Sequence, residues 1–406
     1  MDALMLPSNW QKVRLGDIAE IIGGGTPSTQ ITSFWSGSIN WFTPTEIGIT
    51  KYVHKSQRTI TPLGLKKSSA KLLPIGTILL TSRASIGDCA ILKVVATTNQ
   101  GFQSLIPLEK INNEFLYYLI LTLKNKLLEL ASGSTFLEVS PNKIKNLLIP
   151  LPPLNEQIAI ANVLSDVDHY LYTLDALILK KESVKKALSF ELLSQRKRLK
   201  GFNQAWKKVR LGDIGITISG LAGKTKQDFI NGNAKYITFL NVLNNVIIDT
   251  SILENVKIYP NEKQNSFKKY DLFFNTSSET PKEVGMCAVL LDDIDQVFLN
   301  SFCFGFRIFD KAVDSLFLSY LINSEIGRKA FENLAQGSTR YNLSKSGFNN
   351  VCLFLPPLNE QAAIANILSG LDSEIISLKN KKRQFENIKK ALNHDLMSAK
   401  IRVLKK

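Results

Sequence analysis

The chain carries the same long segment twice, and this repeat limits the possible folds more than any other feature. Residues 151–168 read LPPLNEQIAIANVLSDVD and residues 355–372 read LPPLNEQAAIANILSGLD, with fourteen of eighteen positions identical. A second pair, WQKVRLGDI (10–18) and WKKVRLGDI (206–214), agrees at eight of nine positions. The chain is therefore one unit of about 200 residues written twice.

The two copies agree in their frame and differ in their interiors. Residues 25–110 and 220–312 barely align, although the segments on either side of them match. Uniform divergence after a duplication would blur both parts equally. Matching outer segments around dissimilar interiors predict two recognition domains, here called heads, on a shared framework, each recognising a different target. Inside each head, 75–94 and 270–291 have apolar runs around a polar turn and predict a strand–loop–strand unit.

Each copy ends in a segment with the periodicity of a very long helix. Pro152-Pro153 can begin a helix but not continue one, and apolar residues then recur at intervals of three, four and seven through 154–200 and 358–402. A helix of about 44 residues would be about 66 Å long. One apolar stripe on such a rod needs a partner, so we expect the two rods to form an antiparallel coiled coil. That pairing would place the heads at opposite ends, related by a pseudo-two-fold axis.

The predicted fold class is α+β: two mixed α/β heads joined by two long helices in an internal repeat. No apolar run reaches 18 residues, so we expect no membrane span, and four scattered cysteines suggest reduced core thiols in a cytoplasmic protein. The net charge of +15 suits a polyanionic partner, although a merely basic soluble protein is also compatible with it. The basic linker 194–210 has seven Lys or Arg and no acid. This segment is either a linker that faces phosphates or the solvated C-terminal end of the first long helix.

Catalytic signatures are missing from the sequence. Gly223-Lys224-Thr225 resembles the end of a phosphate-binding loop, but Ile218 stands where that motif needs its first Gly. The three histidines are far apart in the sequence, so a zinc site or a Ser-His-Asp triad would have to be assembled across the fold. The chain is therefore expected to bind and orient rather than catalyse, with no metal and no cofactor of its own.

The repeated LPPLNEQ before a long helix, the WxKVRLGDI opening and the dissimilar interiors resemble the specificity subunit of type I restriction–modification enzymes, over essentially the whole chain. The resemblance implies target recognition domains at 1–150 and 201–354, and spacer helices at 151–200 and 355–406. It implies a bipartite double-stranded DNA target, with one half-site per head and an unread gap. It also implies two modification subunits that supply S-adenosylmethionine and methylate adenine, and restriction subunits that use ATP and Mg²⁺. A bifunctional restriction/methyltransferase fragment with an unrecognised active site is the rival interpretation, and a plain basic scaffold is another.

Candidate DNA-binding residues are polar or basic side chains of the heads and of the Gly-Ser-Thr loops. Those of the first copy are Asn40, Thr43, Lys51, Arg58, Lys66, Lys67, Arg83, Ser85, Asn99, Ser134 and Thr135. Those of the second copy are Lys224, Lys226, Asn241, Asn275, Ser277, Ser278, Lys282, Ser338, Thr339 and Arg340. Candidates for docking a partner subunit are Asn155, Glu156, Gln157, Asn359, Glu360 and Gln361, although Asn and Glu also suit a helix start as cap and first-turn acid.

Overall fold

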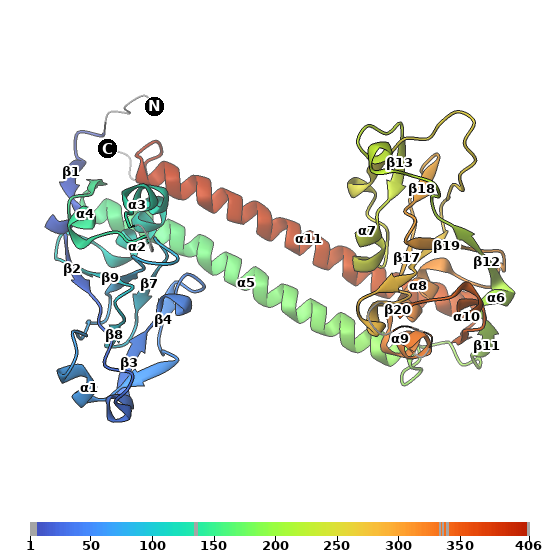
Figure 1. The fold of residues 1–406 in the computed structure, drawn as a ribbon, viewed down its shortest axis with the longest axis horizontal. Coiled ribbons are helices and arrows are strands. Elements are labelled where there is room, and N and C mark those ends of the chain that lie inside the picture. Colours follow the sequence, from blue (N-terminus) through green and yellow to red (C-terminus); the bar gives the residue numbers. More distant parts are fainter. Residues whose placement is uncertain (1–5, 134–136, 333, 335–336, 338–340, 404–406) are drawn as a thin grey trace. The chain divides into compact units, whose positions relative to one another are not determined.

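The computed structural model describes residues 6–133, 137–332, 334, 337 and 341–403 (Figure 1). The chain divides into two compact units: unit 1 is Met1–Asp175 with Asn380–Lys406, and unit 2 is Ala176–Lys379. Each unit therefore holds one head together with a part of both long helices. This division differs from the four segments expected from the sequence, which set the helices apart from the heads.

Unit 1 contains a five-stranded sheet of order β2-β9-β6-β7-β4, a three-stranded sheet β5-β3-β8 and the pair β1-β10. Its strands are β1 (Gln11–Arg14), β2 (Ala19–Gly23), β3 (Trp35–Phe42), β4 (Tyr52–Val53), β5 (Arg58–Ile60), β6 (Ile78–Leu80), β7 (Cys89–Leu92), β8 (Ala96–Thr98), β9 (Gln103–Pro107) and β10 (Leu148–Leu151). Strands β6 and β7 are buried along their whole length, as their continuous apolar runs require. They form the predicted strand–loop–strand unit.

The short helices of unit 1 cover its sheets. They are α1 (Pro62–Lys66), α2 (Asn113–Thr122), α3 (Lys124–Leu130) and α4 (Pro141–Lys145), with 3₁₀ turns η1 (Leu15–Asp17), η2 (Thr32–Phe34) and η3 (Pro44–Glu46). Helix α2 begins at the cap Asn112, whose Oδ1 accepts from the backbone N–H of Phe115 at 2.9 Å. Within this unit α2 contacts both long helices through Tyr118, whereas β3, β8 and α1 are drawn at the opposite end of the head (Figure 1).

Unit 2 repeats this plan with a four-stranded sheet β12-β19-β15-β17, a three-stranded sheet β14-β13-β18 and the pairs β11-β21 and β16-β20. Its strands are β11 (Lys207–Arg210), β12 (Gly215–Ser219), β13 (Ala234–Ile237), β14 (Glu254–Val256), β15 (Leu272–Asn275), β16 (Ser277–Ser278), β17 (Cys287–Val289), β18 (Val297–Leu299), β19 (Cys303–Ile308), β20 (Tyr341–Asn342) and β21 (Cys352–Leu355). Its helices and 3₁₀ turns are α6 (Leu211–Ile214), α7 (Phe239–Asn244), α8 (Ser315–Asn323), α9 (Glu325–Glu332), α10 (Lys345–Asn349), η4 (Lys226–Phe229), η5 (Thr250–Ile252) and η6 (Pro281–Glu283).

The sheets reveal a residue-by-residue equivalence that the sequences of the interiors hide. In unit 1, Trp41 of β3 pairs with Arg58 of the antiparallel β5 and with Thr97 of the parallel β8. In unit 2, Tyr236 of β13 occupies the same place between β14 and β18. The three-stranded sheets of the two heads therefore share strand order and register, while the side chains at equivalent positions differ.

The two rods are α5 (Leu154–Leu193) and α11 (Leu358–Met397), each of 40 residues. Their contacts run antiparallel within each unit, as predicted: Asp168 meets Lys389 and Asp175 meets Lys382 in unit 1, and Lys185 meets Asp372 in unit 2. The fold class is thus confirmed. Both rods end earlier than expected, where Gln195 and Ala399 take positive φ angles of 62° and 58°. None of the described helices is long and apolar enough to cross a membrane.

The last turns of α5, from the first repeat, pack in the core of unit 2. The last turns of α11, from the second repeat, pack in the core of unit 1. Leu396 and Met397 of α11 are buried in the core of unit 1. Leu192 and Leu193 of α5 are buried in the core of unit 2, near the aromatic residues Trp206 and Phe317. Neither head can therefore complete its core from its own repeat alone.

Candidate nucleic-acid interface

The Glu of the first LPPLNEQ motif holds three distant segments of unit 1 together. The side chain of Glu156 is 2% exposed and accepts two hydrogen bonds from Arg402, at 2.7 and 2.8 Å. The indole N–H of Trp10 donates to the same carboxylate at 3.1 Å. The opening segment, the start of α5 and the end of the described chain therefore meet at one carboxylate.

Unit 2 repeats this arrangement. Glu360 is 1% exposed at its side chain and accepts two bonds of 2.7 Å from Arg198, and these bonds raise the pKa of Arg198. Trp206 stands where unit 1 has Trp10, but its indole nitrogen has no partner among the described atoms. Arg198 belongs to the basic linker, so that side chain is engaged inside the protein.

The Gln of each motif makes a second set of internal bonds. The Gln157 side chain donates to the carbonyls of Pro152 and Lys110 at 2.9 and 3.1 Å and accepts from the N–H of Asn112 at 2.9 Å. Gln361 makes the same set, to Pro356, Ala312 and Asp314. Burial leaves these Glu and Gln side chains no surface for another protein. Asn155 and Asn359 are the exposed members of the expected docking set.

A Tyr–Asp–Lys cluster ties each head to the rods. Tyr118 donates to Asp168 at 2.5 Å, and Lys389 of the other rod pairs with the same carboxylate. Burial, together with the bond to Asp168, raises the pKa of Tyr118 far above its ordinary value. In unit 2 the equivalent set is Tyr320, Asp372 and Lys185.

Lys51 belongs to the cluster of unit 1 rather than to an open surface. Its side chain is 11% exposed and pairs with Glu114. Its ammonium also donates to Tyr118 and Ser165 at 2.9 and 2.8 Å. The structure therefore does not leave the Lys51 charge available to a duplex, contrary to the expectation from the sequence.

The remaining candidates of the first head differ in accessibility. Arg58, Lys66, Lys67 and Ser85 are exposed. The other four are partly buried and use polar atoms internally: Asn40 accepts from Ser56, Thr43 donates to Glu46, Arg83 pairs with Glu138 at 2.8 Å, and Asn99 accepts from Gly101. The exposed set lies on β5, at the end of α1 and in the β6–β7 loop.

In the second head, Lys226 and Lys282 are exposed. Lys224 is 5% exposed at its side chain and bonded to Glu262. Four candidates are buried and thereby withdrawn from any contact with DNA in this conformation: Asn241, Asn275, Ser277 and Ser278. Asn241 and Asn275 organise loops, since their side-chain oxygens accept from the N–H groups of Asp249 and Met286. The candidates Ser134, Thr135, Ser338, Thr339 and Arg340 lie outside the described residues.

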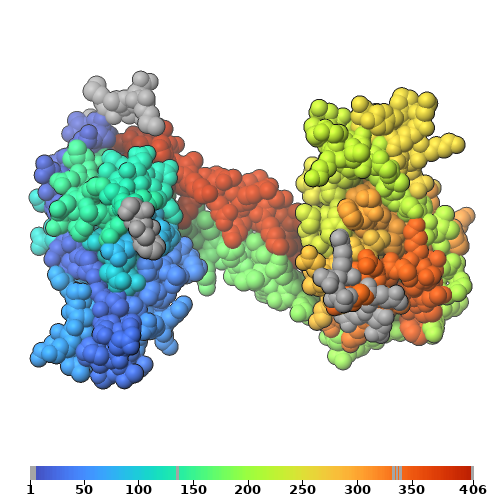
Figure 2. All heavy atoms as spheres, viewed as in Figure 1, coloured from blue at the N-terminus to red at the C-terminus, as the bar shows by residue number. Residues whose placement is uncertain are grey.

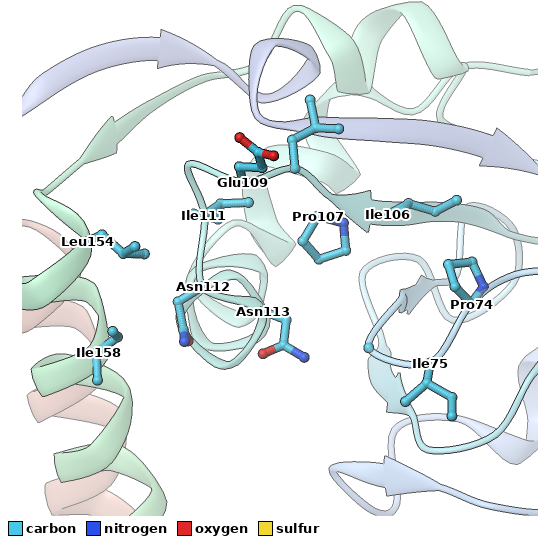
Figure 3. A pocket seen from close by; sticks show the side chains of 12 residues that line it. Pro74, Ile75, Ile106, Pro107, Glu109, Ile111, Asn112, Asn113, Leu154 and Ile158 are labelled. Carbon is cyan, nitrogen blue, oxygen red and sulfur yellow. The ribbon is translucent and has the colours of Figure 1, made fainter.

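One hollow of unit 1 does not suit DNA. It is a groove of about 550 Å³ between the head and the start of α5, edged by Ile75, Leu154 and Ile158 (Figure 3). Its acidic side chain, Glu109, offers nothing to a phosphate. Within the described residues no three His, Cys, Asp or Glu side chains form a metal-binding group. The cysteines are free, and Cys352 is exposed whereas the other three are buried.

Comparison with known proteins decides the family. A model of the type I restriction modification DNA specificity domain matches residues 7–181 and again 203–387. The chain belongs to the type I restriction–modification DNA specificity family. The type I restriction enzyme MjaIX specificity subunit of Methanocaldococcus jannaschii is 31% identical over 299 residues, covering 68% of each chain. The MjaVIII specificity subunit of the same organism is 27% identical and covers 99% of this chain and 95% of its own.

Solved structures agree with the fold of this specificity-family chain. The S subunit of a type I restriction–modification system from M. genitalium superposes with a TM-score of 0.60 at 18% identity, covering 97% of this chain and 98% of its own. The HsdS subunit from Thermoanaerobacter tengcongensis gives 0.53 at 17% identity, covering 98% and 99%.

Sequence reasoning missed Arg198 and Arg402 as structural residues of the specificity-family frame. Arg198 lies 42 residues after Glu156, and Arg402 lies 42 residues after Glu360. The two arginines are therefore separated by the same 204 residues as the two motifs. Extending the repeat alignment past the rods would have paired them.

Proposed function

We propose that the chain is the DNA-sequence-specificity subunit of a type I restriction–modification complex and that it catalyses nothing itself. The observation that carries this is the pair of family-model matches, one on each repeat. The close relatives are named specificity subunits, which supports a role in recognition rather than in chemistry. A bifunctional enzyme fragment is the rival. Methyl transfer or cleavage by the purified chain, given DNA, Mg²⁺ and S-adenosylmethionine, would favour that rival.

Each head reads one half of an asymmetric, two-part DNA target, and the rods set the unread gap. The shared strand register with different side chains supports this, because equivalent positions then meet equivalent places on DNA with different chemistry. Exposed Lys and Arg of the heads supply a sequence-blind, salt-dependent part of the affinity.

The partners are double-stranded DNA, two modification subunits and the restriction subunits, in the cytoplasm. S-adenosylmethionine, ATP and Mg²⁺ belong to those partner subunits. The exposed Asn155 and Asn359 are our remaining docking candidates at the motif. Their equivalent positions suit two copies of one partner.

Exchanging one interior tests the proposal. Replacing residues 25–110 by the corresponding interior of a relative, in complex with the modification subunits, should change one half of the methylated motif and leave the other half intact. Sequencing methylated DNA from cells that express each complex measures this. Changes in both halves would contradict independent heads. The control exchanges 220–312 and should alter the other half.

A further inference from the structure

An exposed arginine of the first head is held against a pair of tryptophans. The guanidinium carbon of Arg58 lies 3.8 Å from the ring centroid of Trp35 and 5.3 Å from that of Trp41. The two indoles meet edge to face, with centroids 5.0 Å apart. These residues belong to β3 and β5, whose segments lie in the blue part of unit 1 in Figure 2.

The platform under Arg58 is anchored to the preceding loop. The indole N–H of Trp41 donates to the carbonyl of Gly25 at 2.8 Å, and that of Trp35 donates to Ser28 at 3.1 Å. Gly25 fits closely, since a Cβ there would lie 2.3 Å from the backbone nitrogen of Ala70. The rings are therefore fixed before any ligand arrives, and stacking removes much of the rotamer freedom that a free arginine would lose on binding.

The N–H donors of the Arg58 side chain are available to a ligand. Among the described residues, no carboxylate or other acceptor pairs with Arg58, unlike Arg83, Arg307 and Arg402. A guanidinium is a planar fork of donors. In duplex DNA, guanine presents two acceptors side by side in the major groove, O6 and N7, and arginine is their commonest specific partner. A phosphate also accepts from arginine, but a phosphate carries no sequence.

The equivalent position of the second head carries the opposite chemistry. Trp41 faces Arg58 across β3 and β5, and Tyr236 faces Glu254 across β13 and β14 in the same register. Glu254 is exposed and accepts from the hydroxyl of Tyr236 at 2.8 Å. An aromatic residue thus positions a donor-only group in one head and an acceptor-only group in the other. A carboxylate repels phosphate, so at a DNA surface Glu254 would have to face a base.

We propose that this register position reads one base pair in each head: Arg58 donates to O6 and N7 of a guanine, and Glu254 accepts from the N4 amino group of a cytosine. The inference rests on the proposed function and adds to it the residues that distinguish the two half-sites. Trp35 and Trp41 act as positioning residues for Arg58, and Tyr236 acts so for Glu254.

The test uses the full chain in complex with its modification subunits. Arg58→Lys keeps the positive charge but loses the fork, so methylation of the wild-type target should fall about ten- to a hundredfold. Sequencing methylated DNA should then show that one guanine of one half-site has become degenerate, while the other half-site stays unchanged. Glu254→Gln should relax one cytosine in the other half-site.

The matched control is Lys66→Ala, which removes another exposed cation of the same head. It should weaken binding across all sequences and lower its salt dependence, without changing the motif. If Arg58→Lys behaves like Lys66→Ala, or leaves the motif intact, Arg58 contacts phosphate or nothing and the inference is overturned. An unaltered second half-site in Glu254→Gln overturns the equivalence of the two heads. If the wild-type complex methylates no two-part motif, the proposed function itself fails.

Discussion

The carboxylate of Glu156 joins segments that are almost 400 residues apart in the chain, from Trp10 to Arg402. The two partners of the ion pair are not equivalent, because the Glu156 side chain is 2% exposed and that of Arg402 is 25% exposed. Removing the arginine strands a buried charge, whereas removing the carboxylate leaves a guanidinium that can reach water.

We expect Arg402→Ala to lower the free energy of unfolding of unit 1 by about 3–5 kcal/mol, the usual cost of leaving one member of a buried ion pair alone. Glu156→Gln should cost less. Chemical denaturation followed by tryptophan fluorescence measures both, since three of the four tryptophans lie in unit 1. The control is Arg210→Ala, which breaks a pair exposed on both sides and should leave the unfolding curve unchanged. Equal losses of unfolding free energy in Arg402→Ala and Arg210→Ala would contradict a stabilising role of the buried pair between Glu156 and Arg402.

The cysteines give a second prediction at this scale. Burial raises the pKa of Cys303 to about 12 and those of Cys89 and Cys287 further, so these thiols stay protonated at pH 8. We expect a thiol reagent to modify Cys352 alone in the native chain and all four cysteines in denaturant. Mass spectrometry of the labelled peptides checks this, and rapid native labelling of Cys287 would contradict the packing of unit 2.

Among the elements, the rods, the repeat and the strand–loop–strand units were predictable, because heptad spacing and duplicated motifs are local properties of the sequence. The equivalence of Trp41 with Tyr236 could not be predicted from the sequence, because it depends on strand register and no aligned residues surround these two positions. The burial of Lys51 and Asn241 was also hidden, because basic and amide side chains usually lie at the surface and only tertiary contacts enclose them. Net charge in the sequence therefore predicts a class of partner, but it does not predict which basic or amide side chains are exposed.

The exchange of rod ends between repeats gives a prediction about elements. Leu192 lies in the first repeat but packs in the core of unit 2, and Leu396 lies in the second repeat but packs in unit 1. Leu192→Ala should therefore destabilise unit 2, and Leu396→Ala should destabilise unit 1, each by about 2–5 kcal/mol. Hydrogen exchange of peptides from both heads locates the loss, and Ile388→Ala at an exposed position is the control. Faster hydrogen exchange in the head of the repeat that carries the substitution, rather than in the other head, would contradict this packing.

In the whole molecule, the rods are the continuous elements that run through both compact units. Oppositely charged pairs such as Asp168–Lys389 and Lys185–Asp372 fix their register, because a shift of either helix alone would separate every pair together. The proposal that rod length sets the gap between half-sites therefore concerns both helices at once.

Insertions into the rods test that proposal. Four residues added after Asp175 in α5 alone displace the following pairs by about 6 Å, so we expect the complex to lose assembly or select a different gap. Seven residues added at Asp175 and seven more at its partner Lys382 preserve the heptad phase and lengthen both rods by about 10 Å. With about 3.4 Å per base pair, the methylated motif should keep both half-sites and gain about three base pairs of gap. Sequencing of methylated DNA reads the gap directly, and an unchanged gap in the matched double insertion would show that the heads, not the rods, fix the spacing.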